Sequence, residues 1–246
     1  MTDNGVLKIK KIITACVYLI AVPAVIALGV FLFKDRKYNV ISIAVAILSC
    51  VPFFVRFENG KRSARELTVI AVMTAISVLG RVIFAPVPGF KPVSAIVIIT
   101  GIAFGCEAGF ITGSLSAVVS NIFFGQGPWT PFQMFVWGFI GFLAGVIFYR
   151  RQKPGIVSLI IIGIIGGILF SLMMDIWSVL SIDGEFLWSR YLTSVISSLP
   201  FMAVYAVSNV VFLLLLTKPL LEKLNRVKTK YGIFTDEKSK PAENAV

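Results

Sequence analysis

The chain consists mainly of long apolar stretches separated by short polar ones. Eight stretches are apolar enough to cross a bilayer as helices, which takes about 20 residues each. They cover residues 12–33, 38–55, 67–84, 93–105, 108–124, 132–149, 156–180 and 191–217. The pattern predicts an all-α integral membrane protein with eight spans and short connecting loops.

The fourth and fifth stretches are short, and the alternative is one continuous helix over 93–124. At 1.5 Å rise per residue that helix would be about 48 Å long, against a hydrocarbon core of about 30 Å. It would also bury Glu107 near its middle, where a carboxylate is costly. The sequence therefore predicts a tight turn at Gly105-Cys106-Glu107.

Charges divide the chain into three parts. Clustered charges between Arg56 and Glu66 separate an N-terminal two-span hairpin, residues 1–63 with basic flanks, from a six-span core over 64–217. Residues 218–246 are polar, which predicts a solvated tail with one short amphipathic turn over 220–224. The spans of the hairpin carry no charge, which favours a packing or assembly element.

Composition and charge support this organisation. The chain is 57% hydrophobic and only 14% charged, whereas about a quarter of the residues in a soluble domain are charged. Eight spans place 17 of the 23 Lys and Arg residues on the same face as both termini, so the positive-inside rule predicts cytoplasmic termini. Basic residues that border apolar stretches are typical of orientation signals, not of nucleic-acid binding.

Enzymatic chemistry finds little support in the sequence. Histidine is absent, which excludes histidine-activated nucleophiles and histidine-ligated zinc or haem. The candidate carboxylates Glu66, Glu107, Asp183 and Glu185 lie in predicted loops on opposite faces, without a metal-ligand or acid–base partner nearby. We therefore expect a protein that binds or transports rather than an enzyme.

Aromatic residues gather on the predicted outer side. All four tryptophans, Trp129, Trp137, Trp177 and Trp188, lie in this half of the molecule. Interfacial aromatic belts form at both membrane surfaces. A one-sided distribution favours an aromatic wall that faces a ligand over a belt alone.

Two charged residues lie within the spans, Arg81 and Asp175, at similar predicted depths near the outer side. Ionisable groups at that depth need a partner or a water-filled cavity. Either the two side chains pair with each other, or one or both contact a polar ligand. Further candidates for ligand contacts in the same layer are Phe90, Lys91, Asn121, Gln126, Thr130 and Gln133.

Two outer loops, 86–92 and 125–131, are rich in proline and glycine. Proline limits the backbone and glycine permits turns that other residues cannot adopt, so both loops hold a defined shape. Together with their aromatic residues, this predicts a rim or lid over a binding cavity.

Small residues at helical spacing predict close helix contacts. Ala71 and Ala75 lie one turn apart on the inner half of the third span, where another helix can approach closely. A second series repeats every four residues, and we expect it to pack helices within the molecule. It comprises Gly101, Gly105, Gly109 and Gly113, with Gly141 and Gly145 on the sixth span.

Residues 64–217 resemble the substrate-binding S components of energy-coupling factor (ECF) vitamin transporters. The segments GFKPVSAIVIITG (89–101) and SNIFFGQGPWTPFQMFVWGFIGFLAG (120–145) are most similar to the cobalamin-type S components. The resemblance implies a six-helix core in a bacterial plasma membrane with an outward-facing pocket capped by loops. The segment from Ala71 to Ala75 matches the helix that docks on the transmembrane T component, which couples to two cytoplasmic ATPases. Accordingly, the chain has no G-x-x-x-x-G-K-[ST] phosphate loop.

The resemblance implies a non-enzymatic subunit that captures a vitamin, with cobalamin or a cobinamide-like precursor as the expected transported ligand and with no cofactor or metal of its own. An aromatic wall with amide donors also suits a flavin, so another vitamin is an alternative. A self-sufficient secondary carrier is a second alternative, but it predicts midplane charges and internal repeats that are not found here. The expected ligand-binding residues are Arg81, Phe90, Lys91, Asn121, Gln126, Trp129, Thr130, Gln133, Trp137, Asp175, Trp177 and Trp188, and the expected docking residues are Ala71 and Ala75.

Overall fold

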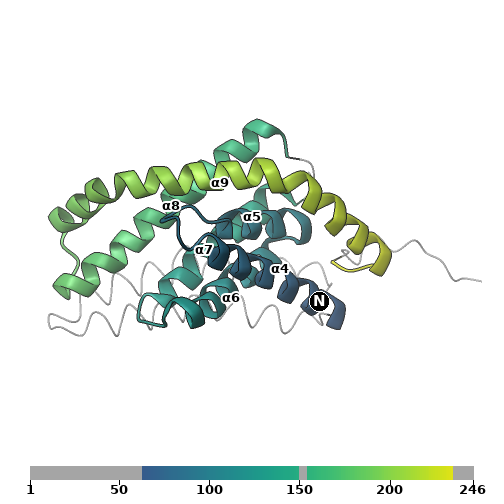
Figure 1. Cartoon of the computed structure of the whole chain (residues 1–246), viewed down its shortest axis with the longest axis horizontal. Coiled ribbons are helices and arrows are strands. Elements are labelled where there is room, and N and C mark those ends of the chain that lie inside the picture. The colour runs from purple at the N-terminus through teal and green to yellow at the C-terminus, as the bar shows by residue number, and fades with distance from the viewer. Residues whose placement is uncertain (1–62, 150–153, 235–246) are drawn as a thin grey trace, which may run out of the picture.

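The computed structural model describes residues 63–149 and 154–234, which form six α-helices (Figure 1). The predicted spans at 12–33 and 38–55 lie outside the described residues. The count of eight spans, the three-part division and the side of the termini therefore stay predictions. The helices are α4 (Ala64–Ile83), α5 (Val93–Phe104), α6 (Cys106–Phe124), α7 (Thr130–Phe148), α8 (Ile156–Asp183) and α9 (Trp188–Tyr231).

The helix boundaries follow local sequence signals. At the start of α4, the Ser63 side chain accepts a hydrogen bond from the Glu66 backbone, and the Glu66 carboxylate accepts one from the Ser63 backbone. This reciprocal capping box satisfies N–H groups that have no partner inside the helix. Gly105 has φ +95° and separates α5 from α6, which confirms the predicted tight turn.

Five of the six described helices are long and apolar enough to cross a membrane, and α5 is the exception. Its 12 residues, all buried, rise only about 18 Å. The stretch predicted as the fourth span is therefore shorter than the hydrocarbon core. It is confined between Pro92 and Gly105, and it packs against α4, α6, α7, α8 and α9.

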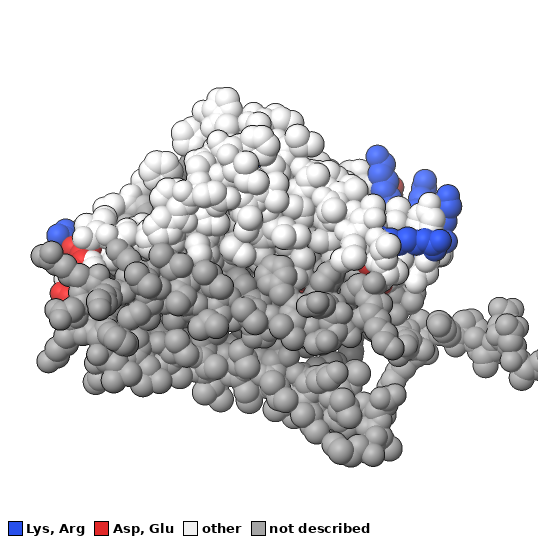
Figure 2. Space-filling view, turned by 90° about the horizontal axis from the view of Figure 1, so that it is seen from below, with Lys and Arg blue, Asp and Glu red and all other residues white. Residues whose placement is uncertain are grey.

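The two ends of the bundle differ in charge. At one end α4 begins and α9 finishes, and the Phe234 backbone N–H donates to the Glu66 carboxylate over 2.7 Å. Figure 2 shows Lys and Arg side chains gathered at this end, which we call the basic end. At the other end, the turn end, Arg190 lies 3.5 Å from Asp183 across the α8–α9 connection. The described surface visible between the two ends is almost free of charged side chains, as a membrane-facing belt requires.

The last helix is longer than the predicted span. It runs 44 residues, about 66 Å along the helix, and bends before its end (Figure 1). It contains Pro200 and Pro219, and proline inside a helix interrupts the backbone hydrogen bonds. Its continuation past Thr217 covers residues that the sequence assigned to a polar tail. Leu221 and Leu224 are buried there, one turn apart, so this amphipathic segment packs on the bundle and exceeds the predicted single turn.

Glycines bring α5, α6 and α7 into backbone contact. A Cβ atom on Gly101 or Gly109 would collide with the carbonyl oxygen of Gly141, and one on Gly113 would collide with the backbone of Trp137. Small residues allow such close approach between helices in a membrane. The prediction that these glycines pack helices within the molecule is confirmed, except that Gly105 forms the turn instead.

We expect the substitution Gly141→Ala to destabilise the fold, because its Cβ would overlap the backbone of Gly109. Overpacking of this kind costs about 1–3 kcal/mol. Gly155→Ala is the matched control, since nothing lies within 4 Å of its Cβ position. Thermal unfolding in detergent measures both variants, and equal midpoints would contradict the proposed role of the glycine contact.

Candidate functional site

A buried arginine lies at the turn-end side of α4. Arg81 is 8% exposed, and its Nη1 donates to Asn121 Oδ1 over 2.8 Å and to Ser120 Oγ. Both acceptors belong to the last turns of α6. The guanidinium therefore links α4 to α6 through neutral side chains.

Asn121 extends these contacts to the next loop and helix. Its Nδ2 donates to Thr130 Oγ1 and to Gln133 Oε1, each over 2.9 Å. Thr130 donates to Gln126 Oε1 over 3.1 Å, and Gln126 Nε2 donates to the Val118 carbonyl over 2.7 Å. We refer to this set as the Arg81 network: Arg81, Ser120, Asn121, Gln126, Thr130 and Gln133.

The loop between α6 and α7 gives the network its geometry. Gly125 has φ +94°, which lets the chain leave α6 sharply, and the Gly127 N–H donates to Thr130 Oγ1 over 3.3 Å. The Trp129 ring occupies the space where a Cβ on Gly127 would lie. These contacts agree with the rigid shape predicted for loop 125–131.

Aromatic rings cover the guanidinium. The Cζ atom of Arg81 lies 4.6 Å from the ring centroid of Phe124 and 5.0 Å from that of Trp137, within the range of cation–π attraction. Trp137 stacks on Phe170 at 5.4 Å, and Phe170 meets Tyr205 edge-on at 4.9 Å. We call Phe124, Trp137, Phe170 and Tyr205 the aromatic row.

The loop between α4 and α5 adds a second cation. The Nζ atom of Lys91 lies 5.4 Å from the Phe124 ring centroid, and burial together with the nearby Arg81 charge lowers the pKa of this lysine. The Lys91 backbone N–H donates to Ser208 Oγ over 2.8 Å, and Ser208 donates back to the Lys91 carbonyl over 3.1 Å. Phe90 packs on Phe212 at 5.1 Å. The predicted rim is thus fixed to the middle of α9.

Asp175 belongs to a separate set of contacts. Its carboxylate accepts hydrogen bonds from Ser194 over 2.9 Å and from Ser198 over 2.6 Å, which ties α8 to α9. Of the two alternatives stated for Arg81 and Asp175, the structure excludes their pairing with each other, since each has other partners. Asp175 lies five residues, about 7.5 Å, beyond Phe170 toward the turn end, and serines of α9 satisfy both of its oxygens.

The four tryptophans do not form one continuous wall. Trp137 contacts Arg81, whereas Trp177 packs against Phe132 at 5.3 Å between α7 and α8. Trp188 is 69% exposed and packs at the turn end with Phe186 and Tyr191. The structure therefore joins only some of the predicted site residues, namely Arg81, Asn121, Gln126, Thr130, Gln133 and Trp137, with Lys91 beside them.

Sequence analysis missed several residues around this site. Ser120 belongs to the Arg81 network, and Phe170 and Tyr205 belong to the aromatic row. Ser208 of α9 exchanges hydrogen bonds with the Lys91 backbone. Tyr205 and Ser208 were detectable as polar groups within an apolar stretch. Among residues 63–149 and 154–234, no group of three or more acidic, cysteine or histidine residues is placed to hold a metal ion. The site offers ring faces and hydrogen-bonding groups for binding.

Comparison with known proteins identifies one family. The model of the family described as ECF-type riboflavin transporter, S component, matches residues 61–225, about two thirds of the chain. No curated protein and no solved structure matches. The matched range contains the whole Arg81 network and the aromatic row. The match is to the riboflavin type, not to the cobalamin type that the two sequence segments resembled.

We predict that Asn121→Ala destabilises the protein more than Gln126→Ala. Asn121 is fully buried, and its loss removes hydrogen bonds with Arg81, Thr130 and Gln133. A buried polar group left unpaired costs about 1–3 kcal/mol. Gln126 is exposed, so water replaces its bonds. Thermal unfolding of both variants measures the difference, and similar midpoints would show that the network is not a structural unit.

Proposed function

Because the chain belongs to the family of ECF-type riboflavin transporter S components, we propose that it is the substrate-binding subunit of an energy-coupling factor importer and that its ligand is riboflavin. This family consists of transporter subunits, not enzymes. The observation that carries the proposal is the family match over a core in which a buried arginine lies against aromatic rings.

The chemistry of riboflavin suits this arrangement. Its isoalloxazine is a flat ring system, and stacking on an aromatic side chain contributes about 0.5–1.5 kcal/mol beyond area burial. Phe124, which is 38% exposed, supplies such a face beside Arg81. The hydrogen bonds from Arg81 to Ser120 and Asn121 occupy two of the five N–H donors of a guanidinium. The remaining donors suit the carbonyl oxygens along one edge of the flavin.

The charge distribution supports an orientation for uptake. By the positive-inside rule the basic end faces the cytoplasm. The Arg81 network, at the other end of α4, then lies toward the outer surface. Riboflavin would bind there from outside the cell.

Transport requires partners that supply energy. The chain contains no phosphate-binding loop motif, so ATP hydrolysis would occur on two cytoplasmic ATPases that couple through a transmembrane T component. Ala71 and Ala75 are both exposed on α4, within an apolar face that includes Val72 and Leu79. Small residues in an uncovered apolar face suit close docking of a T-component helix.

Arg81→Gln is expected to weaken riboflavin binding by about 10- to 100-fold, since a hydrogen bond to a charged group contributes about 1.5–3 kcal/mol. Arg190→Gln is the matched control, because its side chain is 62% exposed at the turn end. Quenching of riboflavin fluorescence by the purified protein measures both affinities. Gel filtration of each variant separates weakened binding from loss of the fold.

The same titration tests the ligand. Binding of cobalamin in the absence of riboflavin binding would support the resemblance of segments 89–101 and 120–145 and would overturn the riboflavin proposal. Equal riboflavin affinities of the Arg81→Gln and Arg190→Gln variants would show that the Arg81 network is not part of the binding site. The family assignment would not be affected by that result.

We expect bulky residues at the two alanines to stop transport but not binding. The double substitution Ala71→Phe and Ala75→Phe should reduce riboflavin uptake to background in cells that contain the ATPases and T component, because the helices can no longer approach. Val146→Phe, at an exposed position of α7, is the control. Parallel loss of uptake and of binding would contradict this division of roles.

A further inference from the structure

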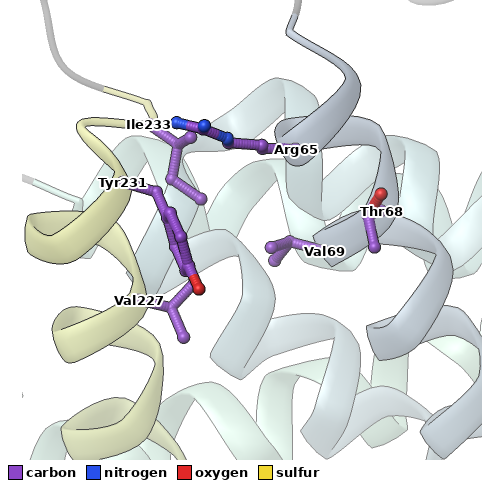
Figure 3. A pocket seen from close by; sticks show the side chains of 6 residues that line it. All are labelled: Arg65, Thr68, Val69, Val227, Tyr231 and Ile233. Atoms are coloured by element: carbon purple, nitrogen blue, oxygen red, sulfur yellow. The ribbon is translucent and has the colours of Figure 1, made fainter.

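A cavity of about 310 Å³ lies at the basic end, between the first turns of α4 and the last turns of α9 (Figure 3). Val69, Val227 and Ile233 form its apolar part. Arg65, Thr68 and Tyr231 complete the lining: Thr68 stands on the α4 side, Tyr231 on the α9 side, and Arg65 reaches from α4 toward Ile233. Its volume is at the lower end of the range for small-molecule pockets, about 300–1,000 Å³.

Two cations stand beside the aromatic ring of this cavity. The Cζ atom of Arg65 and the Nζ atom of Lys230 each lie 5.3 Å from the ring centroid of Tyr231. No acidic residue is among the six described residues that line the cavity. The carboxylate of Glu66, the next residue along α4, accepts hydrogen bonds from the backbones of Ser63 and Phe234. The cavity is therefore suited to a negatively charged group.

The walls of the cavity are held in place by buried contacts. Gly232 turns the chain at the end of α9 with φ +59°, and Ile233 is then 3% exposed. Phe234 packs on Phe104 with ring centroids 4.5 Å apart, and its carbonyl accepts a hydrogen bond from Tyr149 Oη over 2.7 Å. A site whose walls are already ordered loses little conformational entropy when a ligand binds.

The surroundings of the cavity suit a lipid headgroup. Leu67 and Val72 are 48% and 50% exposed on α4, so an apolar helix face continues from the cavity mouth toward the middle of the bundle. Tyrosine is common at membrane interfaces, and Tyr231 is 44% exposed there. Basic pockets between membrane helices on the cytoplasmic side bind anionic headgroups.

We propose that this cavity binds the headgroup of an anionic phospholipid from the adjacent leaflet. The phosphate bridges the Arg65 guanidinium and the Lys230 ammonium, as charge-assisted hydrogen bonding favours. The glycerol and first methylene groups of the lipid cover Val69 and Val227. A zwitterionic lipid carries no net negative charge, so the site discriminates by headgroup.

The test measures lipid binding to the detergent-purified full chain by native mass spectrometry at raised ionic strength, which screens distant charges. Phosphatidylglycerol is the probe, and phosphatidylcholine is the neutral reference. We expect the double variant Arg65→Gln, Lys230→Gln to bind phosphatidylglycerol about 30-fold more weakly. Each basic residue near a membrane surface contributes about 1 kcal/mol, and about 1.4 kcal/mol changes an affinity tenfold. Lys223→Gln with Arg226→Gln is the matched control, since it removes the same charge from exposed positions of α9 outside the cavity lining.

A second variant tests the cavity without changing any charge. Val69→Phe fills the apolar floor, and we expect it to exclude phosphatidylglycerol. Riboflavin binding should be retained, because Arg81 lies 12 residues farther along α4. The proposal is overturned if the unmodified protein binds phosphatidylglycerol and phosphatidylcholine equally well. It is overturned likewise if the two double variants lose the same affinity for phosphatidylglycerol. It is also overturned if soluble glycerol 3-phosphate displaces phosphatidylglycerol at equal concentration, because the apolar floor would then contribute nothing.

Discussion

The backbone contact between the glycines of α5, α6 and α7 determines how the rest of the bundle is placed. Helices in a membrane gain no hydrophobic free energy from associating with each other, so they associate mainly through close packing and hydrogen bonds. The Gly141 carbonyl lies where side chains on Gly101 and Gly109 would otherwise stand. This proximity of α6 and α7 lets Asn121 reach Thr130 and Gln133, and it puts Trp137 beside Arg81.

The way Arg81 is held gives the site its chemical character. A charged side chain in a membrane protein needs compensation, and a carboxylate would cancel the charge. Here a hydroxyl, a carboxamide and two ring faces surround the guanidinium instead. The positive charge is therefore stabilised but not neutralised. Asp175 is likewise compensated by neutral hydroxyl groups, on Ser194 and Ser198.

The surfaces assigned to ligand, partner and lipid follow one another along α4. Arg65 lies in the first turn of the helix at the basic end, and Ala71 and Ala75 are exposed near its middle. Arg81 lies in the last turn, about 24 Å from Arg65 along the axis. α9 reaches the first turn of α4 through Tyr231, beside Arg65, and reaches the loop that follows α4 through Ser208, beside Lys91.

The sequence by itself determined the membrane class, the turn at Gly105 and the glycine packing, because hydropathy, helix length and residue spacing are local properties. It also identified Arg81, Asn121, Gln126, Thr130 and Gln133 as candidates, since polar groups near the end of an apolar stretch stand out. Only the tertiary structure decided which of them meet. Depth counted along separate helices placed Arg81 and Asp175 at one level, but helices differ in length and packing, so equal depth does not imply contact. The contacts of α9 through Tyr205, Ser208 and Phe234 depend on the packing of residues distant along the chain, and spacing alone does not encode them.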